Sequence, residues 1–337
     1  MPSSGPFAFP LRALSWLGNQ GTRAIVLVLV AAIAVPPLGE LARPYVTEAI
    51  FLLLCISFMR VDVAMLRAHL RRPLLVVAAT AWTTIAVPLA VGTIARVSGL
   101  DAGAPELHLA LMLQATASPM MASPALAALM GLDATLVLIT LVTSTALVPL
   151  TAPVFAYIFL GQTLALSPAA LGLKLAGILA AALVVAVAIR FAFGIERIRQ
   201  HRAPIDGVNI CILFVFASAI MAHFLADLVT SPFRMLGLAV LAFAVFFLLL
   251  GITMLLFRRA GRERAMALGV MVSLRNMGLM LAATEGAIPG TTWLYFAMSQ
   301  FPIHLAPQLL RPFADRLRAK PLPSGGTDHG VISPARE

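Results

Sequence analysis

Charged residues are scarce in this chain, and their scarcity decides the class of protein. Only 11% of the 337 residues are Asp, Glu, Lys or Arg, whereas hydrophobic residues make up 61% and the mean hydropathy is +0.97. A soluble domain carries roughly a quarter charged residues. The composition therefore excludes a soluble protein and predicts an all-α protein that crosses a membrane several times.

Cysteines and acidic residues are also few. The two cysteines, Cys55 and Cys211, lie in separate apolar segments without the close spacing of a metal site. No HExxH, GxSxG or phosphate-binding motif occurs on these segments, so we expect no enzyme activity, no cofactor and no bound metal. The excess of Lys and Arg, 24 against 14 Asp and Glu, lies mostly in short loops, which argues against a nucleic-acid partner.

The sequence consists mainly of long apolar segments. A helix needs about 20 mostly apolar residues to cross a bilayer. By this measure the sequence predicts ten membrane spans, at 22–39, 44–60, 73–95, 106–130, 134–160, 167–193, 205–229, 233–257, 263–285 and 290–312. Residues 1–21 are expected to precede the spans, and residues 313–337, rich in Pro, Gly and Ser, to form a disordered tail.

The N-terminal end allows two interpretations. Arg12 and Arg23 precede the apolar run 24–35, and this order also occurs in a signal peptide that ends in small residues. A first membrane span is preferred, because Pro36 and Pro37 follow the possible cleavage point directly and the topology requires that helix.

Basic residues alternate between the loops. They gather after the second, sixth, eighth and tenth spans, and the loops of opposite parity carry almost none, with Arg234 as the exception. Because such residues mark the cytoplasmic side, both termini are predicted to be cytoplasmic. Ten spans divide into two halves of five, 22–160 and 167–312. The second half then enters the membrane in the opposite direction, as in an inverted repeat.

The fourth span of each half contains polar groups and helix breakers. They are Thr116, Ser118, Pro119, Ser123 and Pro124 in one span, and Ser273, Arg275, Asn276 and Gly278 in the other. A helix kinked by proline, with serines bonded to its own backbone, is the structural alternative. Two prolines five residues apart favour unwound segments, which survive in a membrane only inside the protein or beside water. Paired broken helices indicate the binding site of a transporter.

Arg275 is the leading candidate for a binding residue, because it falls near the middle of its span. A cation there costs about 3 kcal/mol on insertion scales and normally has a partner or faces a cavity. A structural ion pair is the alternative, but the nearby acidic residues lie nearer to helix ends, so an anionic substrate is a credible counter-charge. Asn276 offers hydrogen-bond donors and acceptors beside it, whereas Gly278 is typical of helix packing. Five other polar residues either line a pathway or, as favoured here, bond between helices: Thr83, Asn209, His223, Gln300 and His304.

At these residues the chain resembles the bile acid:sodium symporter family over most of 40–312. The matching residues are Arg60, Asp62, Pro73 and Pro88, then Pro119, Ser123, Pro124, Asp133 and Pro149, and finally Arg275, Asn276, Met277, Gly278 and Leu279. The resemblance implies ten helices in two inverted five-helix repeats. Spans three to five and eight to ten would form a core domain in which the unwound fourth and ninth helices cross. Spans one, two, six and seven would form a panel domain, and rotation between the domains would give alternating access to a substrate between them.

The chain departs from this family at the residues expected to hold sodium. In place of the family's oxygen ligands the sequence has Pro124, Val137, Leu141, Met271 and Arg275, and only Thr83 keeps an oxygen. A guanidinium also repels a nearby cation. We therefore expect a bacterial inner-membrane transporter of a small organic anion that does not use sodium. Arg275 would supply a substitute positive charge, and the N-termini of the broken helices would add attraction for the anion. A sodium-coupled symporter, and a sensor or scaffold without flux, remain alternatives.

Overall fold

The regular elements of the structure are all helices. The computed structural model describes residues 8–61 and 73–319; residues 1–7, 62–72 and 320–337 lie outside it, and 62–72 include predicted basic loop residues and part of the family match. Six helices in the described part are long and apolar enough to cross a bilayer: Pro36–Met59, Pro73–Val97, Ala134–Leu160, Pro168–Phe193, Arg202–Thr230 and Pro232–Leu256. They agree with the predicted class, a helical membrane protein.

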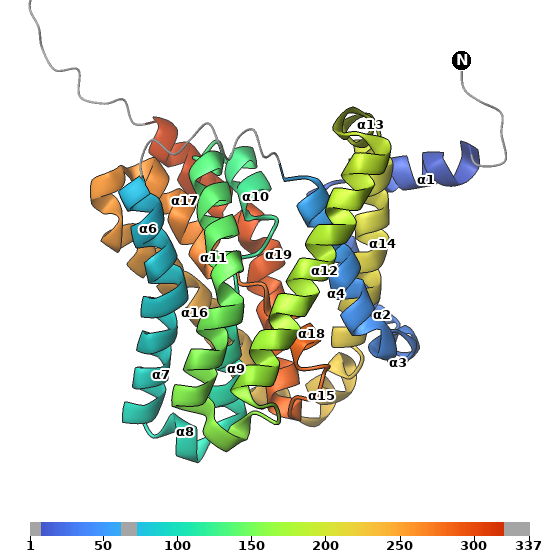
Figure 1. Ribbon diagram of the computed structural model, residues 1–337. Helices are drawn as coiled ribbons and strands as arrows, with labels where there is room; N and C mark the ends of the chain where they lie inside the picture. The colour runs from blue at the N-terminus through green and yellow to red at the C-terminus, as the bar shows by residue number, and fades with distance from the viewer. Residues whose placement is uncertain (1–7, 62–72, 320–337) are drawn as a thin grey trace, which may run out of the picture.

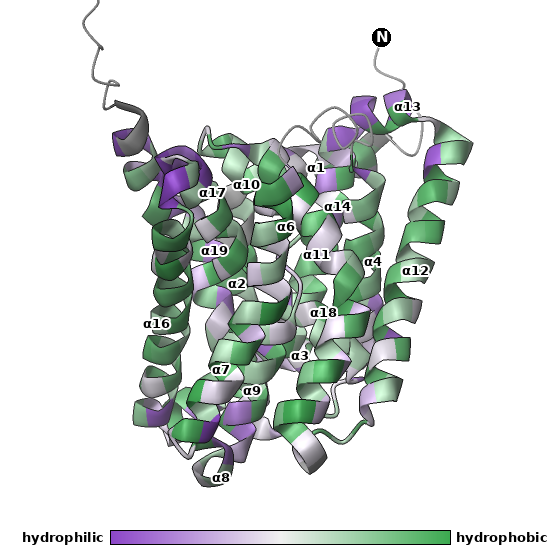
Figure 2. Ribbon diagram, turned by 60° about the vertical axis from the view of Figure 1, so that its left-hand side comes forward, coloured by the Kyte–Doolittle hydropathy of each residue, from purple (hydrophilic) through white to green (hydrophobic). Residues whose placement is uncertain are grey.

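Hydrophilic residues gather at the two ends of the bundle, with a hydrophobic zone between them (Figure 2). Helix α8 (Leu100–Gly103) lies at one end, and α13 (Ile195–Gln200) and the start of α17 (Arg262–Ser273) lie at the other. Helix α1 (Ala8–Asn19) and the C-terminal end of α19 (Gly290–Ala319) also lie at the α13 end (Figure 1). The basic loops around α13 and α17 thus share one end of the bundle, as the alternation of charge predicted.

The helices pack in two groups. The first, called here the α4 group, consists of α2 (Thr22–Ala34), α3 (Pro36–Ala42), α4 (Val46–Met59), α12 (Pro168–Phe193) and α14 (Arg202–Ile220). The second, the α9 group, consists of α6 (Pro73–Ala81), η2 (Trp82–Ala86), α7 (Val87–Val97), α9 (Pro105–Thr116), α10 (Ser123–Leu129), α11 (Ala134–Phe155), α16 (Pro232–Leu256), α17, α18 (Met277–Ala283) and α19. The groups meet where α11 packs on α12 and where α18 packs on α4.

Short elements connect these helices. They are η1 (Arg43–Tyr45), η3 (Ala156–Leu160), η4 (Gly161–Thr163), α15 (Phe224–Thr230) and η5 (Arg258–Ala260). Helices α3, η1 and α4 follow one another closely, as do α6, η2 and α7, so that each run behaves as one long apolar helix.

Four of the ten predicted spans are not single long apolar helices. The first, 22–39, breaks at Val35, whose φ of −126° and ψ of 72° lie outside the helical region, because a residue before proline disfavours that region. The tenth, 290–312, is a single helix, α19, but it is not among the six helices that are apolar enough to cross a bilayer. It continues beyond the predicted span to Ala319. Part of the predicted tail, 313–319, is therefore helical. The fourth and ninth spans are each divided in two.

Helix α1 lies within the segment 1–21, for which the sequence predicted no structure. It packs along α14 at two glycines. A Cβ atom on Gly207 would lie 2.1 Å from the carbonyl oxygen of Leu14, and one on Gly18 would lie 2.0 Å from that of Ala203. The two backbones therefore touch, and any side chain at either glycine would push them apart.

Gly207→Ala is expected to loosen α1 from α14. Overpacking of this kind typically lowers stability by about 1–3 kcal/mol, and hydrogen exchange of the α1 amides should rise with it. Gly237→Ala on α16 is the matched control, because a Cβ atom there has no neighbour within 4 Å. Equal melting temperatures and equal exchange of α1 in the two variants would contradict the close contact.

Candidate functional site

Two prolines give the fourth predicted span its interruption, and they act in different ways. Helix α9 ends at Thr116, and Ala117 is extended with φ −61° and ψ 149°. Pro119 keeps the chain out of the helical region, because it restricts the residue before it. Pro124 instead lies in the first turn of α10, where the missing N–H of proline leaves no helical bond unmade. One proline thus ends a helix and the other begins one.

The ninth predicted span is interrupted between α17 and α18. Leu274 leaves the helix with φ −91° and ψ 95°, and Asn276 caps the next helix, its Oδ1 accepting a hydrogen bond from the Leu279 N–H at 3.2 Å. Gly278 lies in the first turn of α18. A Cβ atom there would meet Phe216 at 3.4 Å, an ordinary van der Waals distance. Gly278 is therefore required neither for the break nor for close packing.

The two interruptions cross and pair as short antiparallel segments, with Pro119 opposite Arg275. The Met120 N–H donates to the Leu274 carbonyl oxygen and the Asn276 N–H donates to the Ser118 carbonyl oxygen, both at 2.7 Å. Neither bond needs a donor from Pro119, which has none. The extended segments thereby satisfy one another where lipid would offer no partner.

The guanidinium of Arg275 is buried at this crossing, with 2% of the residue exposed. Its Nη1 donates to the carbonyl oxygen of Ala117 at 3.0 Å and to that of Thr83 at 3.3 Å. The Ala117 carbonyl is available because α9 has ended, and the C-terminal end of a helix attracts a cation. Arg275 therefore holds α9 and the η2 segment together through their backbones.

The Thr83 carbonyl is available because of a π-helical segment and a proline. In an α-helix the N–H of Val87 would donate to the Thr83 carbonyl oxygen, but at the end of η2 it donates to that of Trp82. The next residue is Pro88, which has no N–H. No helical donor then remains for Thr83, and Arg275 supplies one. The spacing of Thr83 and Pro88 is visible in the sequence, but its meaning depends on the π-helical register.

The charge of Arg275 has no carboxylate partner within the described part of the chain. Two acidic residues that the sequence offered as partners pair with other cations: Asp133 with Arg264 at 3.3 Å and Glu285 with Lys174 at 2.8 Å. Nε and Nη2 of Arg275 are buried and have no hydrogen-bond partner among the described residues. The hydroxyls of the predicted site residues Ser118 and Ser123 are also buried and have no hydrogen-bond partner among the described residues.

Three of the positions at which the family resemblance expects sodium ligands carry apolar side chains that are buried in the hydrophobic core. Val137, Leu141 and Met271 are each at most 1% exposed and belong to one hydrophobic cluster. Leu274 of the crossing belongs to it too. Side chains of this kind offer no oxygen to a sodium ion.

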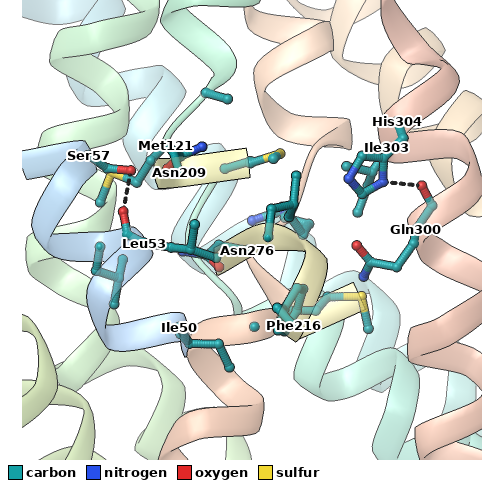
Figure 3. Close-up of a pocket in the computed structure, with 17 residues that line it drawn as sticks. Ile50, Leu53, Ser57, Met121, Asn209, Phe216, Asn276, Gln300, Ile303 and His304 are labelled. Carbon is teal, nitrogen blue, oxygen red and sulfur yellow. Dashed lines mark hydrogen bonds between the residues drawn. The ribbon is translucent and has the colours of Figure 1, made fainter. Parts of the chain in front are cut away.

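A cavity of about 190 Å³ lies between the crossing, α19 and the α4 group, and is called here the crossing pocket. It is lined by six residues that the sequence analysis singled out: Asn209, Arg275, Asn276, Gly278, Gln300 and His304. Figure 3 shows Asn209 and Ser57 on one side, Gln300 and His304 on the other, and Asn276 between them. The His304 ring holds its orientation through Nδ1, 2.7 Å from the Gln300 carbonyl oxygen.

Part of this lining was not predicted from the sequence. Met120 and Met121 belong to the interrupted segment itself, so their position between two prolines was the signal. Ser57 donates to the Leu53 carbonyl oxygen at 2.7 Å from within α4. No sequence pattern separates Ser57 from other serines in apolar helices.

Six predicted binding or pathway residues do not line the pocket: Thr83, Thr116, Ser118, Ser123, His223 and Ser273. Thr116, Ser273 and Thr83 donate to carbonyl oxygens of their own helices at 2.7–3.0 Å, the bond that buried hydroxyls commonly form in helices. His223 lies between α14 and α15, where its Nε2 is 3.0 Å from Nη1 of Arg43. The contact of His223 with Arg43 of η1 joins separate elements, as in the interhelical hydrogen bond that the sequence analysis favoured over a pathway position.

The assembled site combines a buried cation with amide side chains. A buried cation lies at the crossing, and the amides of Asn209, Asn276 and Gln300 supply neutral donors around the cavity. No protein-family model matches this chain, and no curated protein matches it.

Proposed function

We propose that this protein is a secondary transporter that moves a small organic anion across a membrane by alternating access, without coupling to sodium. The observation that carries the proposal is the buried guanidinium of Arg275, without a carboxylate partner among the described residues, where two interrupted helices cross. Pairs of interrupted helices form the binding sites of many secondary transporters. Cations buried at membrane depth are usually functional.

The choice of an anion rests on charge. Arg275 bonds to backbone carbonyls of the α9 group, so its charge acts on the crossing pocket through space. The cavity of about 190 Å³ is smaller than the roughly 300 Å³ at which pockets for drug-sized ligands begin. A small organic acid therefore suits both the charge and the size.

Sodium independence is proposed because Arg275 stands at a position where the family resemblance expects an oxygen ligand for sodium. Its guanidinium bridges two carbonyl oxygens, which is the role a bound metal ion would have. Val137, Leu141 and Met271 leave apolar packing where oxygen ligands would be needed. A permanent cation in the protein thus takes the place of a transported one.

The pocket lies between the α4 group and the α9 group, so relative movement of the two groups would open it to one side and then the other. In this proposal the α4 group acts as a panel and the α9 group as a core. Ten spans in two inverted repeats complete the architecture. Both termini would lie in the cytoplasm of a bacterium, because the basic loops share the end of the bundle that carries α1 (Figure 1).

Thermal stability with a panel of organic anions, in sodium and in potassium buffers, tests the proposal. A ligand at 100 times its Kd stabilises the native protein by about 2.7 kcal/mol. We expect at least one small carboxylate to raise the melting temperature equally in both buffers, and the same anion to enter proteoliposomes that contain the protein. Stabilisation only in sodium would indicate a sodium-coupled symporter instead. Binding without uptake would indicate a sensor or scaffold.

A further inference from the structure

A second cavity, of about 520 Å³, lies among α4, α11 and α12 and shares no lining residue with the crossing pocket. Its wall is almost entirely apolar, with Phe58 from α4, Val142 from α11 and Leu179 from α12 among its residues. Two polar side chains line it: Thr145 and Arg190.

This cavity opens sideways at membrane depth. Leu183 and Val187, which line it from α12, are 51% and 56% exposed, whereas Leu179 is 9% exposed. From Leu179 to Arg190 the helix rises about 16 Å at 1.5 Å per residue. The cavity is therefore long and apolar, and its outer side faces the hydrocarbon of a bilayer.

Arg190 lies at the headgroup end of this cavity, in the last turn of α12. Its Nη1 donates to the Val61 carbonyl oxygen at 2.6 Å, and no carboxylate in the described part of the chain pairs with it. An arginine that keeps other N–H donors available can bind a phosphate with two parallel hydrogen bonds. Charge thus occurs at one end of the cavity only, next to α13 (Figure 1).

We propose that this cavity binds an anionic phospholipid from the leaflet at the α13 end, with one acyl chain between α11 and α12 and the phosphate on Arg190. The lateral opening admits a chain directly from the bilayer, and the lining matches hydrocarbon. A polar organic molecule fits less well, since only one hydroxyl, that of Thr145, lies along the wall. The lipid site does not depend on the proposed transport. If the protein does transport, a chain wedged between α11 and the α4 group would restrain their relative movement.

Native mass spectrometry of the full chain, purified in detergent with equal amounts of dioleoylphosphatidylglycerol and dioleoylphosphatidylcholine, tests the headgroup contact. We expect the wild type to retain one phosphatidylglycerol preferentially, Arg190→Gln to lose that preference, and Arg190→Lys to keep it. Arg258→Gln, which removes an exposed cation at the same end, is the matched control and should behave as wild type. An unchanged preference in Arg190→Gln would overturn the proposal.

The chain position is tested by filling the cavity. Ala146→Phe should reduce the number of retained lipids by one for either headgroup. Leu147→Phe, at the neighbouring position that does not line the cavity, should have no effect. Thr145→Val keeps the shape and removes the hydroxyl, so it should leave lipid binding unchanged. Full retention in Ala146→Phe would overturn the proposal. Loss in Thr145→Val would also overturn it, because it would indicate a polar ligand.

Discussion

Arg275→Gln is expected to reduce greatly both the stabilisation of this protein by organic anions and their uptake. At an effective dielectric constant of about 20, a unit charge about 8 Å from an anion contributes about 2 kcal/mol. This corresponds to a loss of affinity of about 30-fold. The substitution also takes a donor from the carbonyl oxygens of Ala117 and Thr83, and each buried acceptor left without a partner costs about 1–3 kcal/mol.

The two effects are separable because they appear in different measurements. The melting temperature without ligand reports the lost backbone contacts, and the shift produced by ligand reports affinity. Arg275→Lys keeps the charge and should keep a ligand shift, although it loses the geometry of the guanidinium. Arg264→Gln, on helix α17 before the interruption and paired with Asp133 at a partly exposed site, is the matched control and should keep the full shift. An undiminished ligand shift in Arg275→Gln would remove the basis of the proposed function.

The interruption of the fourth span was predictable because proline acts locally. Pro119 lacks a donor and restricts its neighbour whatever surrounds it, so its position alone indicates the end of α9. Arg275 was predictable for a similar reason, since a cation in an apolar segment needs a partner wherever the segment lies. The apolar character of the predicted sodium-ligand positions also follows from single residues, as Val137 and Met271 show.

The direction of the Arg275 side chain could not be predicted in this way. The guanidinium bonds to Thr83, 192 positions away in sequence, and that carbonyl is free only because η2 is π-helical. Side-chain direction and helix register are decided together in the folded core. From the sequence, Arg275 was therefore expected to bind substrate or to supply a substitute charge, and its hydrogen bonds to the protein backbone were not foreseen.

Residues supplied by the α4 group depend on tertiary packing for the same reason. Ser57 and Asn209 come to the crossing pocket from separate helices, and nothing in their local sequence indicates which face of each helix meets α18. Helix α1 is a further case. Its contact with α14 requires Gly18 and Gly207 to coincide in space, and a single glycine in an apolar segment is too common to indicate a partner.

Asn276→Asp is expected to weaken anion binding greatly while leaving the fold intact. The side chain of Asn276 caps α18 through an oxygen, which accepts from the Leu279 N–H, and aspartate is as good a cap as asparagine. The new carboxylate would line the crossing pocket beside Arg275 and neutralise the charge that attracts the substrate. The loss of affinity should match that of Arg275→Gln, about 30-fold or more by the same Coulomb estimate, but without its loss of stability.

Asn276→Ala should have the opposite effects on stability and on ligand binding, and it is therefore the matched comparison for Asn276→Asp. Removing the cap costs about 1 kcal/mol of stability, while the positive charge at the crossing stays. The ligand-free melting temperature should therefore fall in the alanine variant and hold in the aspartate variant. The ligand-induced shift should be partly kept in the alanine variant and greatly reduced in the aspartate variant. Since one substitution changes charge and the other changes capping, no single defect in folding produces both results. A normal ligand shift in Asn276→Asp would mean that the anion does not bind near the start of α18.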